Sequence, residues 1–415
     1  MPSLQEPQPS GEEVIRGLAL EVSAIHARVP RISPFVGLLY DRSRVGPLER
    51  VTAPPYDTVL TEERRRLLDA SPHNVVRLDL GDDLPDDDVD DKYRRAAREF
   101  ERWRAEGILV PTPAPSYFAY EMRFAFQGRR RSVRGLICLV RLEDWGGAIV
   151  PHERTMPGPV EDRLRLMRAL RANLSSIYLI CSGPCPGLAG LLDETCREEP
   201  EASLVDEAGV EHRMWRVDGD HDAVDSLQSQ SLMIADGHHR YTMALRFRDE
   251  MHARFGPGPW DDVMALVVDA ATDDPPVLPI HRVLASGDPP TRGLRVRDLA
   301  EVLQEVNDGE LVYGTVAREN DELVHRVDRL VGRPPLVCAL HAEILDGVAP
   351  TLTYTPDAVV AEEEVRRRGA TAAFILPPTT ATRIRSVVDR GERLPEKSTY
   401  FWPKPRTGMV MRPLD

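Results

Sequence analysis

The segment Asp-Gly-His-His-Arg at residues 236–240 carries the most concentrated chemistry in this sequence. Glycine lets the backbone approach a ligand, and a helix that begins here would direct free N–H groups and a positive dipole end outward. We therefore expect Gly237, His238 and Arg240 to bind phosphate groups. Asp236 could hold Mg²⁺ or orient a nucleophile, and His239 could transfer a proton. The alternative is a packed histidine pair with Arg240 in a salt bridge, but with Tyr241 the junction holds five polar side chains, which favours a catalytic site.

A second grouping begins at His152-Glu153, where a carboxylate beside an imidazole can serve as a general base. We predict Glu153 as the base. Downstream, Arg168 and Arg171 follow one another at helical spacing, so their guanidinium groups could share one face and bind a polyphosphate. A helix laced with internal salt bridges is an equally good interpretation of this pattern. We expect His152 and Asn173 to contact the substrate.

A third grouping lies between residues 392 and 404, which hold two of the chain's three lysines. Arginine supplies the other 50 of 53 basic residues, a bias that GC-rich codon usage explains. A lysine retained in such a chain suggests that a point charge of specific geometry is needed. We predict that Lys397 binds phosphate and Ser398 binds substrate, whereas the aromatic run Tyr400–Trp402 has the character of a core strand.

Two consecutive prolines stiffen the turn Ala53–Asp57 and fix the backbone ahead of its last two residues. We predict Tyr56 and Asp57 as substrate-binding residues, and Asp57 is the second choice for the base.

Short strands and helices must position these groups, in a mixed α+β fold. The strand Leu232–Ala235 runs into the 236–240 loop, and a helix is expected from Tyr241 to His252. A hairpin is predicted from Ser116–Phe126 and Ser132–Arg141. The other expected elements are strands at Phe35–Tyr40, Ile177–Cys181, Pro335–Leu340 and Ala373–Leu376, and helices at Val14–Ile25, Thr61–Ala70, Tyr93–Glu106, Asp162–Ala172, Arg297–Val306 and Thr382–Val388.

The length of 415 residues predicts two or three packed units. We divide the chain into an extension at 1–30, an α+β domain at 31–145, a nucleotide-binding domain at 146–300 and a C-terminal α/β region at 301–415 that completes the site.

Composition excludes several classes of protein. The net charge of −14 makes nucleic acid an unlikely ligand. The chain has no Gly-Lys pair, so it has no Walker A loop, and it lacks the protein-kinase motifs. Five scattered cysteines are typical of a reducing compartment. With no signal-like or membrane-spanning run, we expect a cytoplasmic protein, and the sequence allows a homodimer.

The sequence resembles the bacterial and archaeal family catalogued as domain of unknown function 1015 from about Ile32 to Asp415. The resemblance rests on six blocks in one order: Ala53–Asp57, Ser71–Leu78, His152–Thr155, Ala235–Tyr241, Leu278–Arg282 and Pro395–Tyr400. The segment 236–240 is also similar to the signature of the ParB/sulfiredoxin-like fold, which includes free-serine kinases. In that fold this loop binds nucleotide phosphates, and a separate glutamate acts as the base. Sulfiredoxin chemistry would need a cysteine where His238 and His239 stand.

Two functions follow from this resemblance. The first is a small-molecule kinase that uses Mg²⁺ and transfers a phosphoryl group from ATP or ADP to a hydroxy amino acid, such as free L-serine. The second is a nucleotide-binding regulatory module of ParB type without kinase activity. The acidic charge and the absence of a basic helix-turn-helix pattern favour the kinase.

Overall fold

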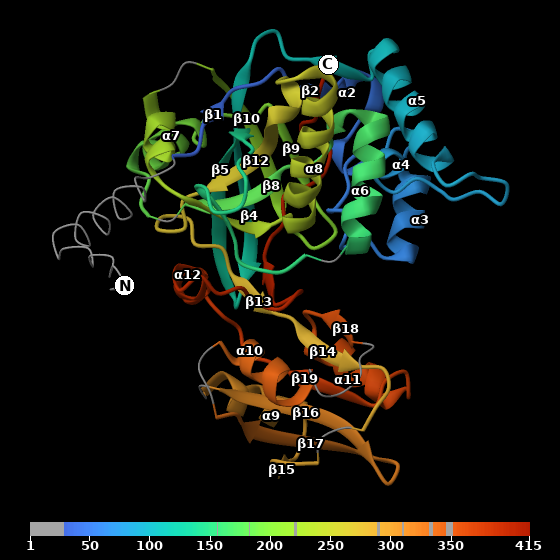
Figure 1. The fold of residues 1–415 in the computed structure, drawn as a ribbon, viewed down its shortest axis with the longest axis vertical. Coiled ribbons are helices and arrows are strands. Elements are labelled where there is room, and N and C mark those ends of the chain that lie inside the picture. The colour runs from blue at the N-terminus through green and yellow to red at the C-terminus, as the bar shows by residue number, and fades with distance from the viewer. Residues whose placement is uncertain are drawn as a thin grey trace, which may run out of the picture.

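The computed structural model describes residues 29–415 apart from 156, 182, 220–221, 289–290, 309–310, 332–334 and 346–351. The expected helix at 14–25 lies outside these residues. The described chain forms two units, each built on one sheet, with the larger unit above the smaller in Figure 1. This arrangement confirms the mixed α+β class.

A long hairpin forms the centre of the larger sheet. β4 (Ser116–Phe126) and β5 (Arg129–Arg141) pair in antiparallel register, and the turn at Gln127–Gly128 falls between the two predicted strands. Gln127 and Gly128 have φ values of 49° and 72°, the left-handed pair that a two-residue hairpin turn requires. The hairpin prediction is therefore confirmed.

Seven further strands extend this hairpin into a nine-stranded sheet. The order is β6-β11-β8-β12-β5-β4-β10-β9, and β1 also pairs with β5. The added strands are β1 (Ile32–Ser33), β6 (Ile149–Pro151), β8 (Ile177–Cys181), β9 (Ala202–Val205), β10 (Glu211–Asp218), β11 (Leu232–Asp236) and β12 (Asp262–Val268).

Helix α8 (His238–Phe255) has two apolar faces, and each face has its own partner. Tyr241 and Leu245 are buried in the core beside the sheet. Met243 and Phe247 pack instead with Leu164 of α6 (Pro157–Leu170) in a separate cluster. α8 is therefore fixed between the sheet and α6, which holds its N-terminal end in place.

The remaining helices and short strands of the larger unit surround this sheet (Figure 1). They are β2 (Leu38–Tyr40), α2 (Arg42–Val45), η1 (Leu48–Arg50), α3 (Thr61–Ala70), α4 (Val76–Asp79), α5 (Asp91–Ala105), β3 (Leu109–Pro111), β7 (Ala172–Asn173), α7 (Pro186–Thr195), η2 (Asp222–Ser229), η3 (Pro259–Asp261), β13 (Val277–Pro279), α12 (Ala381–Asp389), β20 (Thr399–Phe401) and β21 (Arg412–Pro413).

The smaller unit is a six-stranded sheet in the order β15-β17-β16-β19-β14-β18. Its elements are β14 (His281–Leu284), β15 (Leu294–Val296), α9 (Leu299–Asp308), β16 (Val312–Glu319), β17 (Glu322–Arg329), α10 (Leu336–Leu340), the π-helix η4 (His341–Leu345), β18 (Leu352–Thr355), α11 (Ala358–Arg366) and β19 (Ala372–Ile375).

The strand predicted at Pro335–Leu340 is wrong, because this segment is the helix α10. Pro335 precedes the helix as its N-cap, and Leu336, Ala339 and Leu340 follow at spacings of three and four into a buried cluster. A short, uniformly apolar run has no periodicity that separates a strand from a buried helix.

The last segment of the chain returns from the smaller unit to the larger one. β20 pairs with β13, and β21 pairs with β7. The expected boundary at residue 145 falls between strands that share one sheet, and the boundary at residue 300 falls inside α9. Sheet pairing therefore groups β20 and β21 with the larger unit, and α12 packs Ile384 and Val387 into the same core. No helix in the described ranges is both long enough and apolar enough to span a membrane.

Candidate functional site

Two parallel strands, β6 and β11, bring the first polar groups together. Ile149–Pro151 pairs in parallel with Leu232–Ile234, so the residues that follow both strands emerge at the same edge of the sheet. His152 and Glu153 follow β6, and Asp236 ends β11. Two groupings that lie about 80 residues apart in the sequence thus belong to one site.

Gly237 turns the chain from β11 into α8. Its φ of 97° lies in the left-handed region, and a Cβ there would lie 3.1 Å from the Arg240 guanidinium. α8 begins at the next residue, earlier than the predicted Tyr241, because His238 and His239 already belong to its first turn. The helix N-terminus therefore opens directly at the loop, as the sequence predicts.

A buried lysine joins two carboxylates at this loop. Lys404 Nζ bonds Asp236 Oδ1 and lies 3.5 Å from Asp57 Oδ2. Lys397 Nζ lies 3.4 Å from the same Asp57 oxygen. Asp57 comes from the diproline turn and both lysines come from the returning C-terminal segment, so three distant parts of the chain meet here.

These ionic contacts set the protonation states of the two carboxylates. Burial raises the pKa of Asp236, but Lys404 and Arg240 outweigh it and hold the pKa below its usual range. Burial likewise opposes ionisation of Asp57, and Lys404 again outweighs it and lowers the pKa. Lys404 itself has a raised pKa, since the two carboxylates overcome the cost of its burial. The centre is thus two carboxylates and an ammonium, all charged at neutral pH.

Arg240 points into the protein. Its guanidinium donates to Asp236 Oδ2 at 2.6 Å, to Ser175 Oγ at 2.9 Å and to the carbonyl of Ser176 at 2.6 Å. These bonds fix Asp236 against the neighbouring strand. Three donors of Arg240 are therefore engaged inside the protein, and the predicted phosphate contact stays a prediction.

The Glu153 carboxylate accepts hydrogen bonds from the C-terminal segment of the chain. Its Oε1 accepts from the backbone N–H groups of Ser398 and Thr399 at 3.0 and 2.8 Å, and from the Thr399 hydroxyl at 2.7 Å. Burial opposes its ionisation, yet hydrogen bonding to His152 leads the effects that lower its pKa to about 2. A carboxylate this acidic is a poor proton acceptor at neutral pH.

Of the three histidines at the site, His152 and His238 are buried and His239 is half-buried. His152 is fully buried, and its Nε2 lies 2.7 Å from Thr399 Oγ1. His238 Nε2 faces the backbone N–H of His152 at 3.3 Å, and burial lowers its pKa to about 3. His239 is half-buried, and burial followed by the charge of Lys397 lowers its pKa. His239 is therefore a neutral imidazole beside the charged centre.

Other predicted site residues lie elsewhere. Arg168 is on the outer face of α6, where it pairs with Glu250, and Arg171 is exposed where that helix ends. Asn173 is buried and accepts from the backbone N–H of Met264. The structure does not bring these three side chains into the Asp57–Asp236 centre.

Ser398 and Tyr56 lie at the border of the Asp57–Asp236 centre. The Ser398 hydroxyl donates to the carbonyl of Pro395 and accepts from Arg282. The Tyr56 ring lies 4.2 Å from the guanidinium carbon of Arg163. Lys404 and Thr399 are central to the site but are not predicted as site residues, although the rarity of lysine is a signal that could have found Lys404.

A cleft of about 710 Å³ opens between the two units beside this centre. Ser398 and Thr399 form part of its wall, and the rest is apolar apart from a few groups such as two arginines. Leu336 and Pro377 belong to the apolar part of the wall, and the two arginines are Arg383 and Arg390. A cleft of this size and lining suits a ligand with a flat apolar part and an anionic part.

The chain belongs to the family described as "Protein of unknown function (DUF1015)", whose model matches residues 32–336. No curated protein matches the sequence.

Several solved structures are distantly similar. A free serine kinase in complex with AMP has 16% identity and a TM-score of 0.36, over 64% of this chain and 86% of that one. The same values hold for a mutant of that kinase in complex with ADP. A conserved hypothetical protein from Pyrococcus furiosus has 14% identity and a TM-score of 0.35, over 65% of this chain and 93% of that one.

Proposed function

We propose that this member of the family is a phosphotransferase that moves a phosphoryl group from ATP or ADP to the hydroxyl of a small molecule, with free L-serine as the first acceptor to test. One observation carries the proposal: Asp57 and Asp236 share the Lys404 ammonium at the N-terminal end of α8. Phosphoryl transfer needs little covalent help from a protein, and it depends on positioning and on charge stabilisation. Cations, helix N–H groups and paired carboxylates supply both.

Asp57 and Asp236 would supply hard oxygen ligands to a Mg²⁺ ion, in exchange for contacts that Lys404 and Arg240 now make with the Asp236 oxygens. Within the described ranges, no group of three or more histidine, cysteine or acidic side chains could hold a metal. Mg²⁺ commonly takes one or two carboxylates and completes its shell with phosphate oxygens and water, so two carboxylates suffice. When bound, such an ion neutralises charge on the phosphate oxygens.

The chain's own groups have distinct roles in this proposal. Lys397, Lys404 and the free N–H groups at the start of α8 stabilise the charge on the transferring phosphoryl group. His239 accepts the proton of the acceptor hydroxyl, because it is a neutral imidazole close enough to Lys397, Asp57 and Asp236 for their charges to shift its pKa. The acceptor oxygen bonds to phosphorus as the bond to the nucleotide's bridging oxygen breaks.

Glu153 has a structural role in this scheme, although the sequence favours it as the base. Its three hydrogen bonds hold Ser398 and Thr399, and those residues follow Lys397 directly. Glu153 thereby fixes the position of the lysine. The nucleotide would occupy the cleft between the units, with its base against Leu336 and Pro377 and its phosphates toward Ser398.

The test is a transfer assay read by mass spectrometry, with purified protein, Mg²⁺, ATP or ADP, and a pool of hydroxy amino acids. We expect a phosphorylated acceptor with wild-type protein and at least a hundredfold less with Asp236→Asn. Asp249→Asn is the matched control, since Asp249 lies on the exposed side of α8. Nucleotide binding without any phosphoester would contradict the proposal and support a ParB-like regulatory module.

A further inference from the structure

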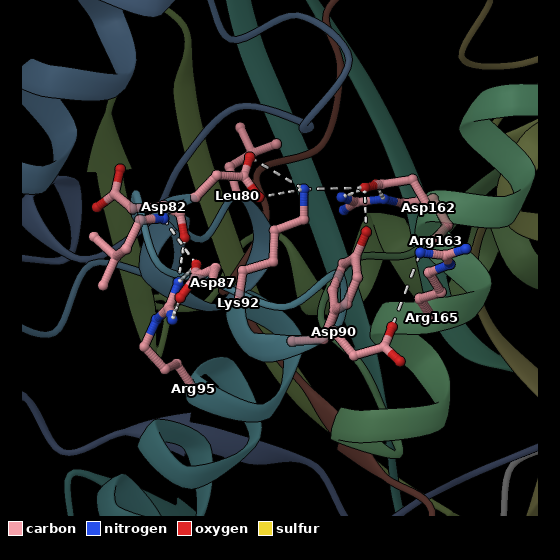
Figure 2. A network of polar contacts seen from close by, with 12 residues as sticks. Leu80, Asp82, Asp87, Asp90, Lys92, Arg95, Asp162, Arg163 and Arg165 are labelled. Atoms are coloured by element: carbon pink, nitrogen blue, oxygen red, sulfur yellow. Dashed lines mark hydrogen bonds and ion pairs between the residues drawn. The ribbon is translucent and has the colours of Figure 1, made fainter.

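A second cavity lies on the other side of the Tyr56–Asp57 turn. It has a volume of about 320 Å³, roughly ten water volumes, and charges of both signs line it. The lining residues that matter here are Tyr56, Arg64, Asp83, Lys92, Asp162 and Arg163. Figure 2 shows the Lys92 ammonium of α5 directed at the Asp162 carboxylate of α6.

The three lysines of the chain gather around this turn. Lys397 and Lys404 both contact Asp57, and Lys92 lines the cavity beside the preceding Tyr56. A chain with 53 basic residues, of which all but three are arginine, retains ammonium groups only here. Because an ammonium is a compact point charge with three donors that can rotate, Lys92 can bind an anionic group of a ligand in the cavity.

Lys92 is loosely held, whereas its neighbours are firmly held. Its Nζ lies 3.3 Å from Asp83 and 3.7 Å from Asp162, longer than a good charge-assisted hydrogen bond. Asp162 is fixed by the Tyr93 hydroxyl at 2.7 Å and by the Arg163 guanidinium. The cavity therefore presents a weakly held ammonium beside a rigid carboxylate.

The buried wall of the cavity consists of Arg163, Asp79 and Tyr56, and it lies on the side of the cavity nearest to Asp57. The Arg163 guanidinium is 7% exposed, bonds Asp79 at 2.7 Å and lies over the Tyr56 ring. Burial raises the pKa of Asp79 more than Arg163 lowers it. This wall carries fixed charge and one aromatic face, and it ends at the residue that precedes Asp57.

We propose that this cavity binds a zwitterionic amino acid. The α-carboxylate bonds Lys92 and Arg64, the α-ammonium bonds Asp162 and Asp83, and the side chain points past Tyr56 toward Asp57. Such a ligand replaces the loose ion pairs of Lys92 with its own and shares the Arg64 guanidinium with Asp82, which lies 2.5 Å from it, so no uncompensated charge is buried. The inference rests on the proposed function in one respect, because it assigns this cavity to the acceptor of the phosphoryl group.

Binding can be measured without catalysis, by saturation-transfer NMR titration of the full chain with L-serine. Ethanolamine, which lacks the carboxylate, and glycolate, which lacks the ammonium, are the comparison ligands. We expect L-serine to bind at least tenfold more tightly than either. Equal binding of ethanolamine or glycolate, or no binding of L-serine, would overturn the proposal.

Lys92→Met tests the residue, and Arg98→Met is its control, because Arg98 is an exposed cation on the same helix. We expect Lys92→Met to weaken L-serine binding at least tenfold and to change nucleotide affinity less than twofold. Asp83→Asn is a second variant in which L-serine binding is measured, and its position is exposed. The proposal therefore stays testable if Lys92→Met does not fold. Unchanged L-serine binding in a folded Lys92→Met or in Asp83→Asn would overturn the proposal.

The two proposals fail in distinguishable ways. Phosphoryl transfer with an unchanged acceptor KM in Lys92→Met would overturn the cavity assignment and leave the kinase intact. Specific binding of L-serine without any transfer would leave the cavity assignment intact and contradict the kinase.

Discussion

Lys404 and Asp236 lie 168 residues apart in the sequence and form a buried ion pair at the loop that begins α8. The Lys404 side chain is 8% exposed, and the same ammonium faces Asp57. This pair ties the end of the chain to the sheet edge where the candidate site lies. It therefore serves the fold as well as the proposed chemistry.

Lys404→Met should destabilise the protein strongly, because it leaves two buried carboxylates without their shared counter-charge. We expect a loss of about 3–5 kcal/mol in the free energy of unfolding, measured by urea denaturation. The double variant Lys404→Met/Asp236→Asn removes one of the two carboxylates, which without Lys404 keep Arg240 and Lys397 as partners, and it should recover part of that loss. A loss below about 1 kcal/mol in the single variant would show that the pair is unimportant for stability.

Gly237→Ala should cost stability for two reasons that act together. The residue has a φ of 97°, and the added Cβ would meet the Arg240 guanidinium at 3.1 Å. We expect thermal unfolding to report a loss of about 1–3 kcal/mol. Gly190→Ala is the matched control, since Gly190 is exposed within α7, has open space around it and should gain up to about 1 kcal/mol. Equal changes in the free energy of unfolding of the two variants would contradict the claim that the backbone at Gly237 requires glycine.

Glu153→Gln separates a structural role from a catalytic one. If Glu153 only anchors Ser398 and Thr399, kcat should fall less than tenfold while stability falls by about 1–3 kcal/mol. A general base would instead lose about 10²–10⁴ in kcat with little change in stability. Parallel measurement of transfer rate and urea midpoint decides between the two, and the second pattern would restore Glu153 as the base.

His238 should make the protein less stable in acid. Its pKa is about 3 in the folded chain, against an ordinary 6.5, so below pH 6.5 the unfolded chain binds a proton that the folded chain does not. The free energy of unfolding should therefore fall as pH drops from 6.5 toward 3, by up to about 1.4 kcal/mol per pH unit for this one group. His238→Gln should reduce this slope by about one proton. An unchanged slope would mean that His238 is not a buried neutral imidazole.

Local patterns of the sequence predict much of the larger unit. The turn at Gln127-Gly128, the strand before Asp236 and the helix after it follow from alternation, glycine placement and helical spacing. The Pro335–Leu340 segment shows the limit, because its apolar run fits a strand or a buried helix equally well.

The site itself depends on long-range packing. The sequence identifies Asp57, Asp236, Glu153 and Lys397 as chemically significant, but only the parallel pairing of β6 with β11 and the return of the C-terminal segment bring them together. Arg168 shows the opposite case. Helical spacing predicts which face of α6 carries Arg168, but it does not predict that this face contacts α8, where Arg168 forms an ion pair with Glu250.

The central claim is that the Asp57–Lys404–Asp236 centre transfers a phosphoryl group. Single-turnover transfer from ATP or ADP, in the presence of Mg²⁺ and with the acceptor that the mass-spectrometric screen identifies, tests it most directly. Wild-type protein should form the phosphoester. Asp57→Asn and Asp236→Asn should each form it at least a hundredfold more slowly while Asp249→Asn keeps the wild-type rate. Equal rates in all four proteins, or no phosphoester from folded wild-type protein that binds nucleotide, would contradict the account.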